Sequence, residues 1–179
     1  GLCLPASAGF DFTFRTVDGE DPDGQLIAAQ LGMTVSDAGP GLVEFAVRNA
    51  ASEPTAMTRV FFDQSDKFAD VIDFDRNELA WTSGQSPVRF LADRKVGNLP
   101  GGNGLSPKFT GDFSASAYNP RPVNGLNENG DTLLVRVALQ PGAGFNDVIG
   151  ALNAGTLRVG LFGQAEAFYR RALEISRHH

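Results

Sequence analysis

Short segments in which apolar and polar residues alternate occupy most of the chain. Near the N-terminus, Phe10, Phe12 and Phe14 alternate with polar residues, and residues 133–139 repeat this pattern. Alternation with a period of two is typical of a strand that buries one face. Gly, Pro, Asn and Asp separate these segments from one another. Further strand-like segments lie at residues 26–35, 43–47, 57–62, 71–74, 88–91, 113–117 and 157–161.

Two segments favour helices instead. Residues 145–152 place apolar residues at i, i+3, i+4 and i+7, which predicts a short helix crossing one end of the sheet. Residues 165–175 consist of good helix formers. Glu166 and Arg170 form an opposite-charge pair at i, i+4 within them. This second segment predicts a C-terminal helix.

Eight or so short strands, without regular alternation of strand and helix, predict a mainly β protein. The expected architecture is an antiparallel β-sandwich of jelly-roll type, with the crossing helix and the C-terminal helix added to it. A closed barrel stays open as an alternative, because alternation does not show whether the edge strands meet. Residues 63–78 and 96–107 are expected to form long loops. We place the sandwich domain at residues 9–162, and the atypical C-terminal helix and tail at residues 163–179.

Residues 1–8 are interpreted as the tail of a secretory signal peptide. Ala6 and Ala8 stand at the −3 and −1 positions of an A-x-A cleavage site, after a short apolar run. Cleavage after Ala8 would remove Cys3, the only cysteine, and a cysteine-free product suits an oxidising compartment. An ordinary N-terminal coil is the alternative. The pattern indicates an exported protein.

Composition removes several classes of function. The chain of 179 residues carries a net charge of −6, which argues against nucleic-acid binding because phosphate neutralisation needs clustered Lys and Arg. No stretch approaches the roughly 20 apolar residues of a membrane-spanning helix. The two histidines are His178 and His179 at the end of the chain, and there is no G-x-S-x-G motif. We therefore expect no enzyme; a small carboxylate-based hydrolase is the third-ranked alternative, although no spacing nominates a pair of carboxylates.

Aromatic residues beside planar polar ones provide the candidate ligand site. Trp81 is the only tryptophan, and Tyr118 precedes Asn119 and lies close to Arg121. Sugar-binding sandwiches use aromatic faces together with such side chains. The alternative for Trp81 is a place in the core or under a lid.

Calcium is the one cofactor that the sequence suggests. Asp18, Glu20, Asp21 and Asp23 bring four carboxylates into one turn-rich loop, and Ca²⁺ takes six to eight oxygen ligands. The loop does not fit the EF-hand pattern. A second acidic cluster consists of Asp63, Asp66, Asp70, Asp73 and Asp75. Both sets are more simply explained as solvating loops of an acidic protein, so no bound cofactor is the first expectation and calcium is the alternative.

Four motifs resemble those of one bacterial group. They are Asn-Leu-Pro-Gly-Gly at residues 98–102, Asn-Pro-Arg-Pro-Val-Asn-Gly-Leu at 119–126, the helical segment at 145–155 and Leu-Arg-Val-Gly-Leu at 157–161. Together they resemble the secreted domains of PEP-CTERM proteins, which exosortase systems process, and the resemblance covers residues 9–161. The chain departs from the group after Leu161, where another strand, a polar linker and the Pro-Glu-Pro tail with its apolar anchor are expected.

The resemblance implies export by a Gram-negative bacterium in association with exopolysaccharide and biofilm matrix, and it supplies no catalytic residues. We therefore expect a non-catalytic, secreted protein of the cell surface or extracellular matrix, with polysaccharide or matrix proteins as partners. A carbohydrate-binding module, assisted by calcium, is the alternative.

Overall fold

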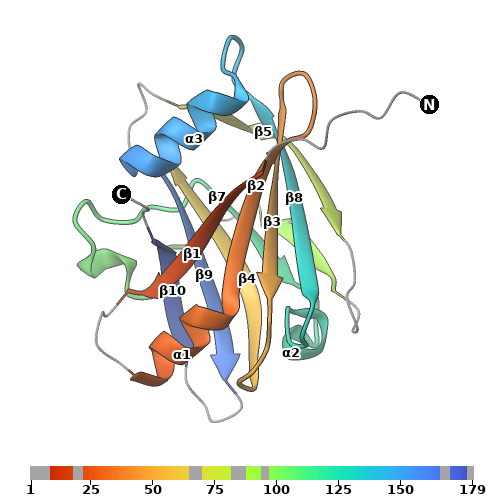
Figure 1. Ribbon diagram of the computed structural model, residues 1–179, viewed down its shortest axis with the longest axis vertical. Helices are drawn as coiled ribbons and strands as arrows, with labels where there is room; N and C mark the ends of the chain where they lie inside the picture. The colour runs from red at the N-terminus through yellow and green to blue at the C-terminus, as the bar shows by residue number, and fades with distance from the viewer. Residues whose placement is uncertain are drawn as a thin grey trace.

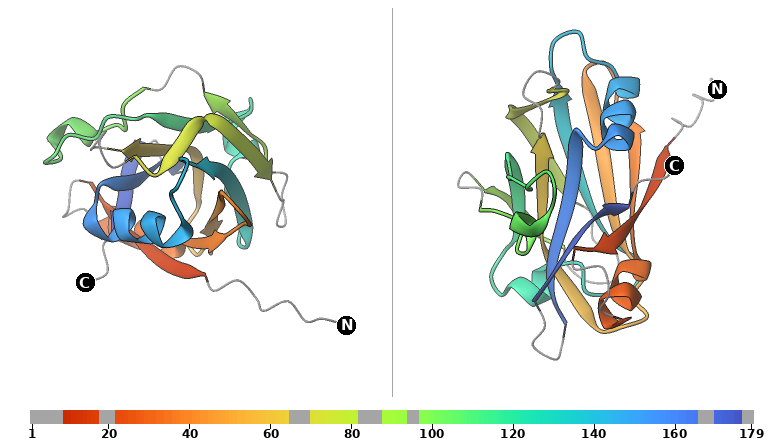
Figure 2. Two further views of the ribbon diagram at one scale, coloured as in Figure 1. Left: turned by 90° about the horizontal axis from the view of Figure 1, so that it is seen from above. Right: turned by 90° about the vertical axis from the view of Figure 1, so that its left-hand side faces the viewer.

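A computed structural model describes residues 9–17, 22–64, 70–81, 88–93, 97–165 and 170–176, with only the backbone described at 75–81, 164–165 and 170–176. The protein is mainly β and antiparallel, in agreement with the predicted sandwich (Figures 1 and 2). The strands of the described part are β1 (Phe10–Thr16), β2 (Leu31–Asp37), β3 (Leu42–Asn49), β4 (Thr55–Gln64), β5 (Ile72–Trp81), β6 (Phe90–Asp93), β7 (Phe113–Ala117), β8 (Asp131–Leu139), β9 (Leu157–Ala165) and β10 (Arg170–Ser176). The helices are α1 (Pro22–Gln30), α2 (Arg121–Asn124), α3 (Phe145–Ala154) and a 3-10 turn at Gly102–Gly104.

Hydrogen bonds join the strands in the order β5-β8-β3-β2-β1-β10-β9-β4-β7-β6. This sheet folds over so that its two halves face each other (Figure 2). Ring contacts between the halves show where the core lies. The ring of Phe45 on β3 stands 5.1 Å from that of Phe62 on β4, and Phe74 on β5 stacks on Phe113 of β7 at 5.3 Å. One hydrophobic core therefore fills the space between the two halves.

The predicted alternation sets which residues enter that core. Phe12 and Phe14 are buried, while their neighbours along β1 are exposed. On β8, Leu133, Val135 and Val137 have no exposed surface. Strands were also correctly predicted around 43–47, 57–62, 71–74, 88–91, 113–117 and 157–161.

The segment 26–35 was wrongly predicted as a single strand. It divides between α1, which ends at Gln30, and β2, which begins at Leu31. Pro22 begins the helix, a position where its fixed φ and missing N–H are tolerated. The Gln30 side chain joins the end of the helix to the connection between β3 and β4, because its Oε1 accepts the N–H of Glu53 at 2.9 Å. The apolar run therefore contains a change of element that periodicity over so few residues does not reveal.

The long loop predicted at 63–78 was also wrong in its extent. Asp63 and Gln64 still belong to β4, and β5 begins at Ile72. The Gln64 side chain forms hydrogen bonds with the backbone of this segment, as a neighbouring strand would. Its Oε1 accepts the N–H groups of Val71 and Ile72 at 2.9 Å each, and its Nε2 donates to the Ile72 carbonyl at 3.0 Å. Polar residues that indicated a loop thus support the start of a strand.

The helix α3 confirms the prediction at 145–152 and covers one end of the sheet (Figure 1). Its buried apolar residues are Val148, Ile149, Ala151 and Leu152. It ends at Gly155, whose φ of 74° is a left-handed conformation that favours glycine. In the described ranges, no helix combines the length and the apolar character that crossing a membrane requires.

The predicted C-terminal helix at 165–175 is wrong. β9 continues to Ala165, and Arg170–Ser176 forms β10, which pairs antiparallel with both β1 and β9. Helix propensity and i, i+4 charge pairs are worth only a few tenths of a kcal/mol each. A place between two strands gives the backbone hydrogen-bond partners on both sides instead. The sheet therefore extends to Ser176, beyond the domain end predicted at residue 162, whereas the predicted signal segment at residues 1–8 lies outside the described residues.

Candidate functional site

Three of the four predicted ligand residues lie where β7 leads into α2: Tyr118 and Asn119 are on the connecting loop, and Arg121 is the first residue of α2. Tyr118 is 51% exposed, and Asn119 and Arg121 are exposed beside it. Trp81 is the last residue of β5, where its backbone pairs with Leu133. Its side chain lies outside the described part of the structure, so the prediction for Trp81 stays a prediction.

Hydrogen bonds hold the backbone of this loop on both sides. Asn124 donates its side-chain amide to the carbonyls of Tyr118 and Pro120, at 3.2 Å each. The N–H of Tyr118 donates to the carbonyl of Arg89 at 2.9 Å, and the N–H of Arg89 donates to the carbonyl of Asn124 at 2.9 Å. The peptide bond between Asn119 and Pro120 is cis. The exposed ring of Tyr118 is therefore carried by a well-anchored backbone.

The end of the 119–126 motif is hydrogen-bonded to β4. Leu126 is fully buried and exchanges two backbone hydrogen bonds with Met57, of 3.1 and 2.9 Å. Asn49 donates its side-chain amide to the Leu126 carbonyl at 3.0 Å. At Gly125, a Cβ atom would lie 2.5 Å from the Met57 carbonyl oxygen, which only glycine avoids. The Asn-Gly-Leu part of the motif is thus a structural attachment.

A polar cluster crosses the outer face of β4, β7 and β6 next to this loop. Arg59 donates its Nε to the Ser116 hydroxyl at 2.9 Å and its Nη2 to Asp93 at 3.3 Å. Ser114 donates to the same Asp93 oxygen at 3.1 Å, and the Ser116 hydroxyl also donates to it. The guanidinium carbon of Arg59 lies 4.6 Å from the centre of the Phe61 ring. The cluster ties the three strands together and neutralises Asp93.

A second ion pair is buried rather than exposed. Asp63 and Arg158 form a salt bridge in which the side chains are 0% and 6% exposed. Arg158 also donates to the carbonyls of Pro107 and Lys108, at 2.7 and 2.8 Å. Burial raises the pKa of the Asp63 carboxyl above its ordinary value of 3.8, although the guanidinium of Arg158 acts in the opposite direction. The pair holds the loop at 97–112 against the sheet.

This loop carries a small apolar core of its own. Phe61, Leu99 and Phe109 are all buried and pack together on the outer side of β4. At Gly102, a Cβ atom would lie 3.0 Å from Cβ of Phe109 and 3.3 Å from Cβ of Leu99. Gly101 has a φ of 80°, which favours glycine. The Asn-Leu-Pro-Gly-Gly and Leu-Arg-Val-Gly-Leu motifs therefore meet in one structural feature, the closure of this loop over the sheet.

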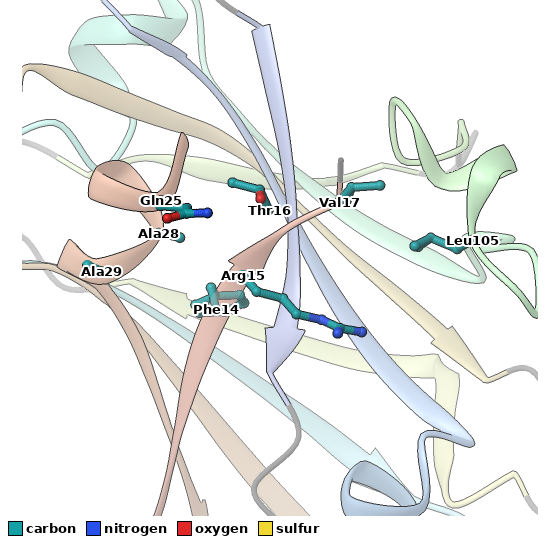
Figure 3. A pocket seen from close by; sticks show the side chains of 8 residues that line it. All are labelled: Phe14, Arg15, Thr16, Val17, Gln25, Ala28, Ala29 and Leu105. Atoms are coloured by element: carbon teal, nitrogen blue, oxygen red, sulfur yellow. The ribbon is translucent and has the colours of Figure 1, made fainter. Parts of the chain in front are cut away.

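A cleft of about 450 Å³ opens at the end of β1 (Figure 3). In Figure 3, Gln25 of α1 points toward Thr16, and Leu105 of the 97–112 loop points toward Val17. Tyr118, Asn119 and Arg121 are not among the described residues that line this cleft. Its lining residues are Phe14, Arg15, Thr16, Val17, Gln25, Ala28, Ala29 and Leu105.

The first of the two acidic clusters falls largely outside the described residues. Asp18, Glu20 and Asp21 lie there, while Asp23 is exposed in the first turn of α1. Calcium binding at this loop stays a prediction.

In the second acidic cluster, Asp63 is buried against Arg158, and Asp70 is exposed just before β5. Asp73 is part of β5, whereas Asp66 and the side chain of Asp75 lie outside the described part. Within the described ranges, no three His, Cys, Asp or Glu side chains are grouped so that they could hold a metal ion.

Comparison of the chain with protein-family models, with curated proteins and with solved structures gives no match. The functional argument therefore depends on the residues themselves. The sequence analysis missed Arg89, whose carbonyl accepts the N–H of Tyr118, and the Arg59–Asp93 pair on the adjoining strands. Arg59 is the one charged residue among the mostly apolar residues 56–62 of β4, and this was the available signal for an outward-facing position.

Proposed function

We propose that this protein is a non-catalytic component of the bacterial cell surface or extracellular matrix, and that it binds exopolysaccharide through the loop around Tyr118. The observation that carries the proposal is the half-exposed Tyr118 ring on an anchored backbone, with Asn119 and Arg121 beside it. We call Arg89, Tyr118, Asn119 and Arg121 the Tyr118 surface.

The chemistry of these groups suits a sugar ring. A hexose presents C–H groups on its faces and hydroxyl groups at its edges. The aromatic ring covers the first, and planar amide and guanidinium groups hydrogen-bond the second. Because the loop backbone is already held by Asn124 and Arg89, little conformational freedom is lost when a ligand binds.

Two features of the sequence support the cellular setting. The Ala6-Ser7-Ala8 segment has the pattern of a signal-peptide cleavage site. The motifs at 98–102, 119–126 and 157–161 resemble those of PEP-CTERM domains, and β10 occupies the place where that resemblance leads one to expect another strand after Leu161. On this basis we propose export by a Gram-negative bacterium.

Thermal unfolding across a panel of bacterial polysaccharides tests the proposal. A ligand at a hundred times its dissociation constant adds ~2.7 kcal/mol to the stability of the native state. For a domain of this size, that raises the midpoint by about 5–10 °C. We expect such a shift with at least one polysaccharide, and a saturable isotherm in calorimetry would favour a binding module over weak matrix packing.

The variant Tyr118→Ala should abolish the shift without changing the midpoint of the free protein. Leu26→Ala is the matched control, because Leu26 is 55% exposed on α1 and lies outside the Tyr118 surface. A panel without any shift, or a shift that Tyr118→Ala leaves intact, contradicts the proposal.

A further inference from the structure

We infer that the Tyr118 surface recognises an acidic polysaccharide, with Arg89 and Arg121 binding the carboxylate of a uronate unit whose ring packs on Tyr118. This inference rests on the proposed function and adds to it the class of ligand and the role of Arg89.

The distribution of charge along the chain points to an anion. Residues 82–127, which include β6, β7 and α2, contain five Lys and Arg against two Asp, a net charge of +3. The whole chain carries −6. The Tyr118 surface thus lies in a basic segment of an acidic protein, and such a segment concentrates negatively charged ligands locally.

The strand pairing places Arg89 next to Tyr118. Phe90 pairs with Ala117, and the N–H of Tyr118 donates to the Arg89 carbonyl one position further along this ladder. Residues opposite each other on antiparallel strands have Cβ atoms about 4.5–5.5 Å apart and share a face of the sheet. The N–H of Arg89 also donates to Asn124, three residues after Arg121 in α2. The backbone of Arg89 therefore joins the segment that carries Tyr118 to the helix that carries Arg121.

Several arginines of the described part have acidic partners within the fold. Arg59 pairs with Asp93, Arg136 with Glu44 and Arg158 with Asp63. Their positive charges are already balanced within the fold.

The guanidinium groups of Arg89 and Arg121 are exposed instead, and no hydrogen bond or ion pair in the described structure uses them. On the adjoining strand β6, Asp93 is paired with Arg59 and accepts hydrogen bonds from two serine hydroxyls, so its negative charge is balanced within the fold. Two unused cations beside an exposed aromatic ring form a site for a ring that carries a carboxylate.

Uronate units match this arrangement in shape as well as in charge. A uronate is a hexose whose C6 is a carboxylate, so ring faces and negative charge occur in one residue. An arginine guanidinium binds a carboxylate through two parallel N–H···O bonds. The ring face can lie on Tyr118 while the carboxylate reaches an adjacent guanidinium, and repetition along a polymer supplies successive carboxylates to the two arginines.

The test measures binding of the full chain to sodium alginate, to dextran of similar length and to single-stranded DNA, in calcium-free buffer. We expect alginate to bind, dextran to bind at least tenfold more weakly, and DNA not to compete with alginate. Arg89→Gln and Arg121→Gln should each weaken alginate binding about tenfold, the size expected for loss of a charge-assisted hydrogen bond.

The binding of alginate should also weaken as the salt concentration rises from about 0.01 to 0.15 M, because the Debye length falls from ~30 to ~8 Å over this range.

Arg15→Gln is the matched control, because Arg15 is an exposed arginine on β1 that lines the cleft of Figure 3 and is not part of the Tyr118 surface. It should leave alginate binding unchanged, and the unfolding midpoints of all three variants should match that of the parent chain. Binding to dextran that depends on Tyr118 but on neither arginine would overturn this inference and leave the proposed function standing. Failure of every polysaccharide overturns both, and DNA bound as tightly as alginate overturns the assignment to a polysaccharide.

Discussion

Gly125 directly follows α2, at the point where the chain passes close to β4. No other residue type fits there. A Cβ atom at this position would be 2.5 Å from the Met57 carbonyl oxygen and 3.2 Å from that of Arg121. Both contacts are with backbone, which cannot rotate away. The requirement arises from the tertiary approach of α2 to β4 rather than from the local turn, since Gly125 has an extended φ of −82°.

Replacing Gly125 by alanine should therefore lower the free energy of unfolding by roughly 1–3 kcal/mol, the range for an overpacked site. Gly104→Ala is the control, because nothing lies within 4 Å of a Cβ built there and its φ is not positive. Urea unfolding of the two variants measures the difference. Equal stabilities would show that the attachment at Leu126 adjusts without loss.

The strand β10 connects the two halves of the sheet, because it pairs with β1 on one side and with β9 on the other. It has four paired positions with β1 and five with β9, so it lies between two strands that are far apart in the sequence. Removing it would leave the facing edges of both neighbours without partners, and an unpaired edge is a site of aggregation.

A chain that ends after Ala165 should therefore lose cooperative unfolding and become insoluble. A chain that lacks only residues 177–179 serves as the control and should unfold like the parent. The measurement is thermal unfolding followed by circular dichroism, with solubility compared at equal protein concentration. A soluble shortened chain with an unchanged midpoint would contradict this account of β10.

In the molecule as a whole, the Asp63–Arg158 pair connects β4, β9 and the 97–112 loop. Replacing Arg158 by Met leaves a buried carboxylate without its cation, and we expect a loss of about 3–5 kcal/mol at pH 7. Arg136→Met is the control, because Arg136 pairs with Glu44 at a site where its side chain is 40% exposed. A pair of that kind is worth about 0–1 kcal/mol.

The pH dependence of this loss follows from the direction of the pKa shift. A raised pKa in the native state means that the native protein binds the Asp63 proton more tightly than the unfolded chain does. The contribution of Asp63 to stability therefore falls as the pH rises from 3.8 through the native pKa. Without Arg158 that pKa rises further, so the destabilisation by Arg158→Met should be smallest in acid and largest near neutral pH. Urea unfolding as a function of pH measures it, and a loss that is equal at all pH values would contradict this account.

Much of the fold and one part of the candidate site could be predicted from the sequence. β1 and β8 show a period-two alternation, and α3 shows a 3.6-residue pattern. Both patterns arise locally from which side chains must be buried, so both could be recognised in the sequence. Tyr118, Asn119 and Arg121 could be nominated together because they are close in the chain. Asp63 was assigned to an acidic loop, since nothing near it in the sequence indicates that Arg158 would accompany it into the interior.

By itself, the sequence determined which residues enter the core, where most strands run and that the fold is antiparallel and mainly β. The reason is that burial of one face imposes a periodicity that can be recognised within a few residues. Only the tertiary structure decided that residues 170–176 form a strand, because pairing with β1 and β9 outweighs a helix preference of a few tenths of a kcal/mol per residue. The tertiary structure also placed the backbone of Arg89 beside that of Tyr118. The order of strands in a sheet is set by hydrogen bonds between distant segments, and it cannot be predicted from either segment alone.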